Sequence, residues 1–301
     1  MSTAIDTSWA VEWLVYQLTD SLLPTGGFVC SSGLEAAAQH GWVRDESSLM
    51  HWCEASLTAC ARASLPFLDE AYRLAHGHRP SATATAAAAR HHYTWCSGDW
   101  WDPIDTAMSS STSSTSAGIW RELVALDDRC DACITTNVAR KSSQSQGRAL
   151  ITAYVRCFAD NPPSDPANGR VATQHAEQLA HGFLQGIRRG HVVGHLPISF
   201  GLSCAALGLE LERTRHLFLF LYARNLFSSA VRLNLVGPYR AQRLLQQLSA
   251  RATEAMQQHV AQMQAYEAAG ESPIAATAQI APLLDLFQGA HDRLYSRLFH
   301  S

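Results

Sequence analysis

QLTDSLLPTGGFVCSSGLEAAAQHG, residues 17–41, is the stretch around which the rest of the chain is organised. An apolar helix is expected to end at the two leucines before Pro24, because proline cannot extend it without removing a backbone donor. Gly26 and Gly27 then permit a turn that residues with a β-carbon rarely adopt. The sequence therefore predicts a sharp change of direction between two helices, with Phe28 on the short connection.

A second helix is expected directly after this turn. Ser31 or Ser32 suits its N-cap, and Gly41 suits the position just beyond its last residue. Phe28 then has two interpretations. It is either a core side chain that fills the helix junction, which the pattern alone favours, or an exposed anchor for a partner.

The composition indicates a globular protein that can bury a large core. The chain has 301 residues, of which 47% are hydrophobic, and a formal net charge of -3. This balance offers no basic surface for nucleic acid. The first 20 residues lack the regions of a signal peptide, and no uncharged apolar run is long enough for a membrane span. We expect a cytoplasmic protein that binds neither nucleic acid nor membrane.

Helical periodicity recurs along the chain, whereas alternating strand patterns bounded by hairpin turns do not. We expect an all-α fold, a single helical-bundle domain of about ten helices over residues 1–301. Residues 210–235 are apolar nearly all round and are the expected central, buried helix. A long helix capped by Asp45 is expected to be interrupted at Pro66.

Residues 76–118 differ in character from the rest. Alanine and threonine dominate first, and the segment then runs into SSSTSSTS at residues 109–116. Serine and threonine compete with the backbone for hydrogen bonds and bury little apolar area. We expect a low-complexity insertion here, disordered or irregular, on the surface of the domain.

Signatures of catalysis are weak throughout. Cys130-x-x-Cys133 has no second pair at zinc spacing, so core cysteines are the favoured interpretation. His191 and His195 have the spacing of helical metal ligands, but the glycines beside them weaken a helix, and solvated loop histidines are favoured. No phosphate-binding glycine loop or nucleophile elbow is present. We expect no enzymatic activity, no resident metal and no cofactor.

Three separated stretches resemble the urease accessory protein UreF family, in its eukaryotic form. They are the segment from Asp20 through LPTGGF to Gly33-Leu34-Glu35, the middle segment of residues 196–211 with Tyr222-Ala223 and SSAVRLNLVG at 228–237, and HDRLYSRLFHS at 291–301. The three follow one another in the family's order and cover both ends and the middle of the chain. The resemblance implies one UreF-like all-α domain.

The resemblance also implies a function and a set of partners. UreF-like proteins are helical dimers that bridge a second accessory protein, UreD or UreH, to the nickel-carrying GTPase UreG, and the assembly loads nickel into apo-urease. The chain is thus expected to be a non-catalytic maturation protein and a homodimer. Two alternatives remain open: a helical enzyme with a metal held by His191, His195 and a distant carboxylate, and a helical adaptor without a connection to nickel.

Individual positions follow from the same resemblance. Phe28 occupies the place of the family's junction aromatic, and Arg297 that of the arginine in its Leu-Tyr-Ser-Arg-Leu tail. Both, together with Tyr295, are implied to engage UreG, and Arg232 matches a polar position of the family. The residues expected to support the junction are Asp20, Pro24, Gly26, Gly27, Gly33 and Glu35.

The C-terminal segment is predicted to form a short helical turn. Its apolar side chains would share one side of that turn, namely Leu294, Tyr295, Leu298 and Phe299. Arg293 and Arg297 would lie on another side. Arg297 is then either a solvated cation near a helix end, or a fork onto a carboxylate or backbone carbonyl, beside Phe28 or on the GTPase.

Overall fold

Helices are the regular structure of the described part of the chain. The computed structural model describes residues 7–78, 114–159 and 170–300. Within these ranges there are ten α-helices, three 3-10 helices and no strand, which confirms the all-α prediction. The elements are α1 (Thr7–Thr19), η1 (Gly27–Val29), α2 (Leu34–Gln39), α3 (Glu46–Ala75), α6 (Ser114–Cys133), α7 (Asn137–Cys157), α8 (Arg170–Arg189), α9 (Leu196–Ala206), α10 (Leu211–Arg232), α11 (Pro238–Ala268), η2 (Pro273–Ala276), α12 (Pro282–Ala290) and η3 (His291–Arg293).

The centre of the fold is α9, in which every residue from Pro197 to Ala206 is buried. Gly201 lets α9 lie against α3, because a β-carbon there would come within 2.5 Å of the Leu68 carbonyl oxygen. The prediction that α10 is the central helix is wrong. Phe220 on α10 is 43% exposed, so one side of that helix faces outward. The shorter α9 is rich in small residues and is enclosed by α3, α7 and α8.

A single helix of 30 residues, α3, passes through Pro66 without a break. It begins at a capping box in which the Asp45 carboxylate accepts a hydrogen bond from the Ser48 amide at 2.8 Å. The predicted interruption at Pro66 is wrong. Proline cannot donate to the Arg62 carbonyl oxygen one turn earlier, but the Ala278 amide donates to that oxygen at 3.4 Å. A distant segment thus replaces the missing helical hydrogen bond.

A buried ionic cluster fastens α3 to α10 and α11. The Asp69 carboxylate accepts hydrogen bonds from Arg215 Nε at 2.8 Å and Nη2 at 2.7 Å, and His259 Nε2 lies 2.8 Å from its Oδ2 atom. Burial alone would raise the pKa of Asp69, but the hydrogen bonds from His259 and Arg215 outweigh burial and hold that pKa below its ordinary value. Asp69 is therefore charged in the folded protein at neutral pH.

The predicted insertion at residues 76–118 meets the described chain only at its two ends. Residues 79–113 lie outside the described residues. At the far end, α6 begins at Ser114, inside the serine tract and close to the expected boundary at about residue 118. Serine and threonine are favoured at helix starts as well as in loops, so composition alone does not fix where the helix begins.

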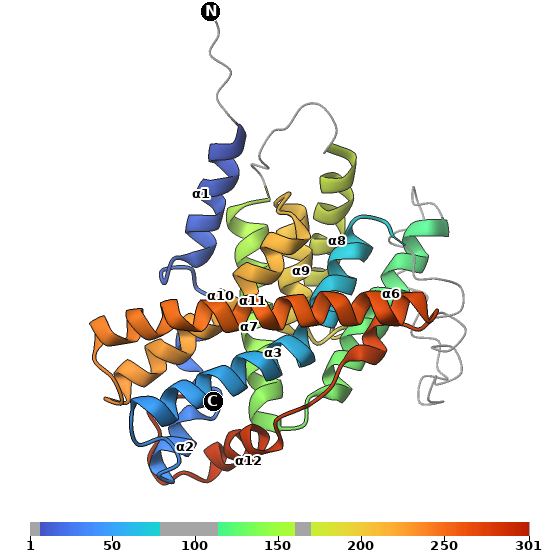
Figure 1. Cartoon of the computed structure of the whole chain (residues 1–301). Helices are drawn as coiled ribbons and strands as arrows, with labels where there is room; N and C mark the ends of the chain where they lie inside the picture. The colour runs from blue at the N-terminus through green and yellow to red at the C-terminus, as the bar shows by residue number, and fades with distance from the viewer. Residues whose placement is uncertain (1–6, 79–113, 160–169, 301) are drawn as a thin grey trace, which may run out of the picture.

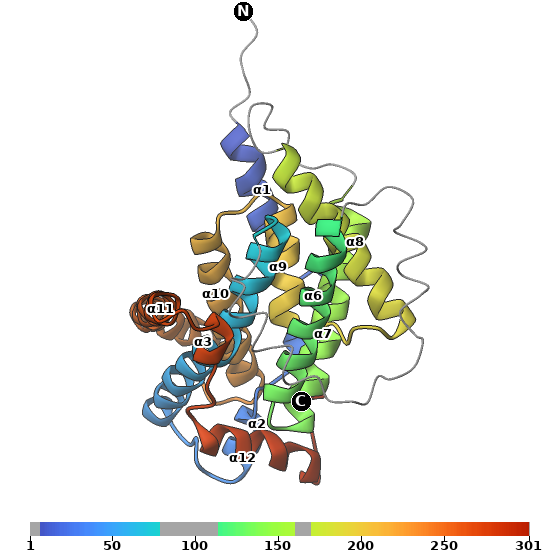
Figure 2. The same cartoon turned by 90° about the vertical axis from the view of Figure 1, so that its right-hand side faces the viewer.

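The helices are arranged so that the C-terminal elements return to α2. Figure 1 shows α11 crossing the front of the bundle and α1 projecting from it. Figure 2 views α11 nearly end-on, with α7, α8 and α9 packed beside one another. In both views α12 lies next to α2. Among the helices of the described ranges, none has the length and apolar character that crossing a membrane requires.

Candidate functional site

The junction between α1 and α2 is a turn built on Asp20 and two glycines. The Asp20 carboxylate accepts a hydrogen bond from the Leu22 amide at 3.0 Å, so α1 ends before the leucines that were expected to close it. Gly26 has a φ of 72°, which favours glycine. A β-carbon at Gly27 would lie 2.5 Å from Asn225 Nδ2, so the Asn225 side chain would have to move to accept any other residue.

Phe28 is presented to solvent by η1. Its side chain is 55% exposed, so the interpretation of Phe28 as a core side chain is wrong. Pro24 is also exposed, in the segment that leads from α1 to the two glycines. An aromatic side chain held on a short, well-defined turn is typical of an interface anchor.

A glycine, rather than a serine, starts α2. Gly33 is the N-cap with a φ of 82°, and a β-carbon there would lie 3.0 Å from the backbone nitrogen of Gln288 on α12. The predicted cap at Ser31 or Ser32 is therefore wrong, since the close approach of α12 requires glycine at this end. The other end agrees with the prediction, because Gly41 follows α2 with a φ of 71°.

Glu35 on α2 is a buried carboxylate that holds the C-terminal tail, defined here as residues 294–300. The residue is only 2% exposed. Its two oxygens accept hydrogen bonds from the Leu298 amide at 2.6 Å and the Phe299 amide at 3.1 Å, and His291 Nε2 lies 3.1 Å from Oε2. Gln39 Nε2 also donates to Oε1, at 3.5 Å, so four hydrogen-bonding groups surround this buried carboxyl group.

Arg232, the last residue of α10, connects the junction to the tail. Its guanidinium carbon lies 4.3 Å from the ring centroid of Phe299 and 6.0 Å from that of Phe28, and the group donates to the Phe28 carbonyl oxygen. Burial lowers the pKa of Arg232 from its ordinary value, but a guanidinium remains charged at neutral pH. This cation therefore stacks on the tail aromatic and fixes the backbone of the junction aromatic.

Two further contacts attach the tail. The His300 amide donates to the Val29 carbonyl oxygen at 2.9 Å, directly beside Phe28. The Gln39 side-chain amide donates to the Ser296 carbonyl oxygen at 3.0 Å. The tail is thus bound along its length to the junction turn and to α2.

The prediction of a helical tail with one apolar side is wrong. The chain is extended at Leu294, directly after η3. Phe299 is 3% exposed, whereas Leu298 is 59% exposed and Tyr295 is fully exposed. The reason is that Glu35 takes the amides that a helical turn would use internally. The exposed side chains form what we call the junction–tail surface: Phe28, Arg232, Tyr295, Arg297 and Leu298.

Arg297 lies on this surface and does not reach Phe28. Its Nη1 atom lies 3.2 Å from Asp292 Oδ1, and both side chains are almost half exposed. An exposed pair of this kind contributes only about 0–1 kcal/mol to stability. The structure thus pairs Arg297 with a carboxylate within the C-terminal segment and leaves its guanidinium accessible from solvent.

Glu35 and Arg232 were expected at this site, but their contacts were not, and neither His291 nor the role of Phe299 was predicted. One signal was present. Glu35 is a lone acidic residue in the apolar segment LEAAA, where a buried carboxylate needs a partner. No pattern identified the partners, because they lie at the opposite end of the chain.

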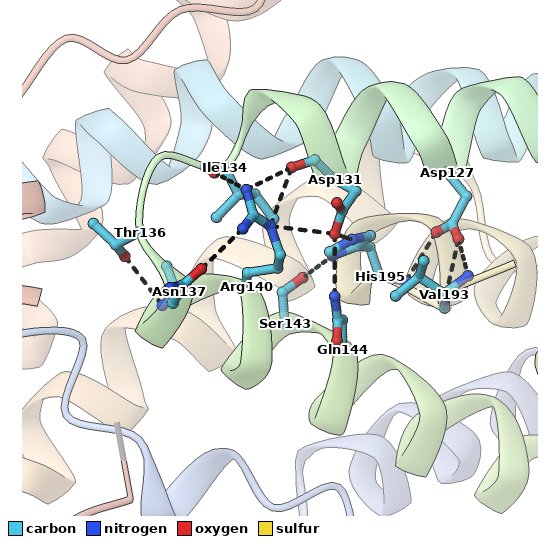
Figure 3. Close-up of polar contacts among 12 residues, drawn as sticks. Asp127, Asp131, Ile134, Thr136, Asn137, Arg140, Ser143, Gln144, Val193 and His195 are labelled. Carbon is cyan, nitrogen blue, oxygen red and sulfur yellow. Dashed lines mark hydrogen bonds and ion pairs between the residues drawn. The ribbon is translucent and has the colours of Figure 1, made fainter. Parts of the chain in front are cut away.

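His195 belongs to a second polar cluster, at the start of α9 (Figure 3). Its Nε2 atom lies 3.0 Å from Asp131 Oδ1 and its Nδ1 atom lies 3.1 Å from Ser143 Oγ, with the side chain fully buried. Asp127 accepts hydrogen bonds from the amides of Gly194 at 2.9 Å and His195 at 3.0 Å. The expectation of a solvated loop histidine is wrong for His195, because the cluster uses it to fix α9 against α6 and α7.

The residues suggested for a metal or redox site do not form one. Both ring nitrogens of His195 are engaged within the protein, and no group of three His, Cys, Asp or Glu side chains in the described ranges is placed to hold a metal ion. Burial raises the pKa of Cys130 well above its ordinary value and also raises that of Cys133, so both thiols remain protonated at neutral pH. Cys130 is buried in the core, as predicted.

Fold and site together define a helical protein in which buried polar clusters fix the geometry of an exposed surface. Comparison with models of protein families identifies the family within this class of helical proteins. The model of the UreF family matches residues 43–249, more than half of the chain. The chain belongs to the UreF family.

Relatives from three kingdoms share this similarity. The chain is 32% identical over 249 residues to urease accessory protein 6 of Cryptococcus neoformans var. grubii, covering 77% of this chain and 74% of that one. It is 30% identical over 294 residues to urease accessory protein F of Arabidopsis thaliana, covering 98% and 94%. It is 25% identical over 286 residues to urease accessory protein UreF of Escherichia coli O157:H7, covering 95% of each. The fungal and plant relatives are thus more similar than this bacterial one, in line with the eukaryotic form of the sequence motifs.

Proposed function

We propose that this chain is a non-catalytic urease maturation protein of the cytoplasm. In this proposal it acts as a homodimer that bridges a UreD/UreH-type accessory protein to the nickel-carrying GTPase UreG, and so enables nickel insertion into apo-urease. Membership of the UreF family supports the proposal, because the relatives described above carry the name of urease accessory protein.

The junction–tail surface is the observation that carries the proposal, as the docking site for the GTPase. It offers an aromatic side chain, Phe28, and an arginine, Arg297, which are residue types that dominate binding energy at interfaces. Glu35 and Arg232 hold the backbone beneath these side chains. A surface ordered in advance loses less conformational freedom when the partner binds.

Pull-down experiments with purified GTPase and UreD/UreH-type protein test the proposal. We expect Phe28→Ala and Arg297→Ala each to weaken capture of the GTPase by about tenfold or more, the effect of truncating one anchor at an interface. Capture of the UreD/UreH-type protein should stay at the level of the unaltered protein.

Matched controls exist elsewhere on the molecule. Tyr239→Ala truncates an aromatic side chain on α11 that is 90% exposed. Arg251→Ala breaks an exposed ion pair with Glu254. The Arg251 side chain is about as exposed as that of Arg297. Both control variants should retain both partners. Normal GTPase capture by Phe28→Ala and Arg297→Ala contradicts the proposed docking site, and loss of both partners together indicates misfolding instead.

A further inference from the structure

A groove lies beside the junction–tail surface, between the turn after α1, the C-terminal half of α10 and the start of α11. Its volume is about 590 Å³, which lies within the roughly 300–1,000 Å³ that is usual for ligand pockets. Phe28 and Arg232 line the groove as well as the junction–tail surface. The two features are therefore continuous.

The groove carries an excess of positive charge. Two arginines, Arg224 and Arg232, and one carboxylate, Asp20, are its charged lining residues. Arg224 donates to the Thr19 carbonyl oxygen and, at 3.4 Å, to Asn225 Oδ1. Burial lowers the pKa of Arg224 while Asp20 acts in the opposite direction, and the guanidinium remains charged at neutral pH.

The start of α11 also borders the groove, through Pro238, its first residue. Proline has no amide hydrogen, so this residue offers no donor to the groove. An anionic group in the groove would thus meet the two guanidinium groups.

Apolar side chains also line the groove. They are Leu23, Phe227, Val231 and Leu245, of which Phe227 is buried. Apolar side chains beside two guanidinium groups match a peptide that carries apolar side chains between carboxylates, since charge complementarity gives specificity and apolar contact gives affinity.

We propose that this groove binds a short acidic segment of the GTPase, with an apolar side chain against the apolar lining residues and carboxylates toward Arg224 and Arg232. The choice of partner rests on the proposed function, because Phe28 and Arg232 belong to both features. Binding here extends the contact from the exposed anchors of the junction–tail surface into the body of the protein.

The test changes the charge of the groove at Gln242, an exposed lining residue on α11. The dissociation constant of purified GTPase is measured at low and at high ionic strength. We expect Gln242→Glu to weaken binding by about three- to tenfold at low ionic strength and Gln242→Lys to strengthen it by a similar factor. Salt should reduce both effects, because it screens exposed charges.

Gln247 provides the matched control, as an exposed glutamine on the same helix that does not line the groove. Gln247→Glu and Gln247→Lys should leave GTPase binding unchanged. If the Gln242 and Gln247 variants shift the dissociation constant of the GTPase equally, the shift arises from the net charge of the protein, and the groove inference is overturned.

Two further outcomes separate this inference from the proposed function. If Phe28→Ala weakens GTPase binding while neither Gln242 variant changes it, the groove inference fails and the proposed function stands. If the Gln242 variants instead shift binding of the UreD/UreH-type protein, or the mass of the protein in solution, the occupant is that partner or a second copy, and the assignment to the GTPase is overturned. Opposite shifts at Gln242 with normal binding by Phe28→Ala support the groove and remove Phe28 from the interface.

Discussion

At the scale of single residues, the side chains proposed to face a partner differ from those that hold the backbone beneath them. Phe28 is exposed, and Arg297 is nearly half exposed and pairs only with the exposed Asp292 among the described ion pairs. Glu35 is buried and binds two backbone amides of the tail. This carboxylate is therefore a central one of several contacts that hold the last described residues against the junction.

Replacing this carboxylate tests that role. Glu35→Gln keeps the shape of the side chain but turns one acceptor oxygen into a donor group, which then faces an amide or His291. We expect the free energy of unfolding to fall by roughly 1–3 kcal/mol, the cost of an unsatisfied buried group. Hydrogen exchange at the Leu298 and Phe299 amides should accelerate, and GTPase capture should fall as it does in Phe28→Ala.

The control for this variant is Glu271→Gln, which alters an exposed glutamate after α11. It should match the unaltered protein in stability, exchange and capture. If Glu35→Gln lowers stability but leaves exchange in the tail unchanged, Glu35 stabilises α2 and does not hold the tail.

At the scale of elements, local chemistry allowed some boundaries to be predicted from sequence and not others. Asp45 and Gly41 mark helix ends that the structure confirms, because caps and left-handed glycines act within a few residues. The continuity of α3 through Pro66 could not be predicted, because the amide of Ala278 that replaces the lost hydrogen bond comes from far along the chain. The extended tail was missed for the same reason, since it depends on Glu35.

The remaining wrong predictions concern which residues are buried. The apolar content of α10 suggested a central helix, but it is the small residues of α9 that allow neighbours to approach from every side. His195 was expected in solvent because glycines flank it, whereas Asp131 and Ser143 enclose it. Of the candidate site, the resemblance to the UreF family named Phe28, Glu35, Arg232 and Arg297 as positions, whereas the contacts among elements could not be predicted.

The cluster that joins α3, α10 and α11 is predicted to control the stability of the bundle. Arg215→Met leaves the Asp69 carboxylate buried without its main partner, and removing one member of a buried pair costs about 3–5 kcal/mol. Urea unfolding measures this loss. Arg251→Met, which breaks an exposed pair, should leave the free energy of unfolding unchanged within error. A small loss in Arg215→Met would mean that His259 or water satisfies Asp69 alone.

The same carboxylate gives stability a dependence on pH. The pKa of Asp69 is lower in the folded protein than its ordinary value of 3.8, so its contribution to stability is fully present above that value and is lost as the pH falls through the lower, folded-state pKa. The difference in free energy of unfolding between the unaltered protein and Asp69→Asn should therefore shrink as the pH is lowered below 3.8. Urea unfolding at a series of acidic pH values measures this difference, and a constant difference would contradict the assignment.

At the scale of the whole molecule, an apolar patch on α12 is the face that we predict for self-association. Leu283 is 51% exposed and Leu286 is 67% exposed, and beside them Trp42 packs on Phe287 with ring centroids 5.4 Å apart. Exposed apolar patches commonly mark contact sites, and a twofold dimer pairs one patch with its own copy.

Light scattering at micromolar concentration is expected to give the mass of two chains of 32.9 kDa, and Leu286→Asp that of one chain. Phe220→Asp, on the exposed side of α10, serves as the comparison and should remain dimeric. A one-chain mass for the unaltered protein contradicts the dimer, and dissociation by Phe220→Asp alone places the dimer face on α10.

The hydrogen bonds between Glu35 and the tail also have a consequence for biosynthesis. Glu35 and Phe299 are 264 positions apart in the chain, and ribosomes add about 5–20 residues per second. Roughly 15 to 50 seconds therefore pass between the synthesis of the carboxylate and that of the amides that satisfy it. During translation, Phe28 is synthesised long before the tail residues that contact its turn. The nascent protein cannot present the complete junction–tail surface, so in the proposed function the GTPase would be recruited only after the tail has left the ribosome.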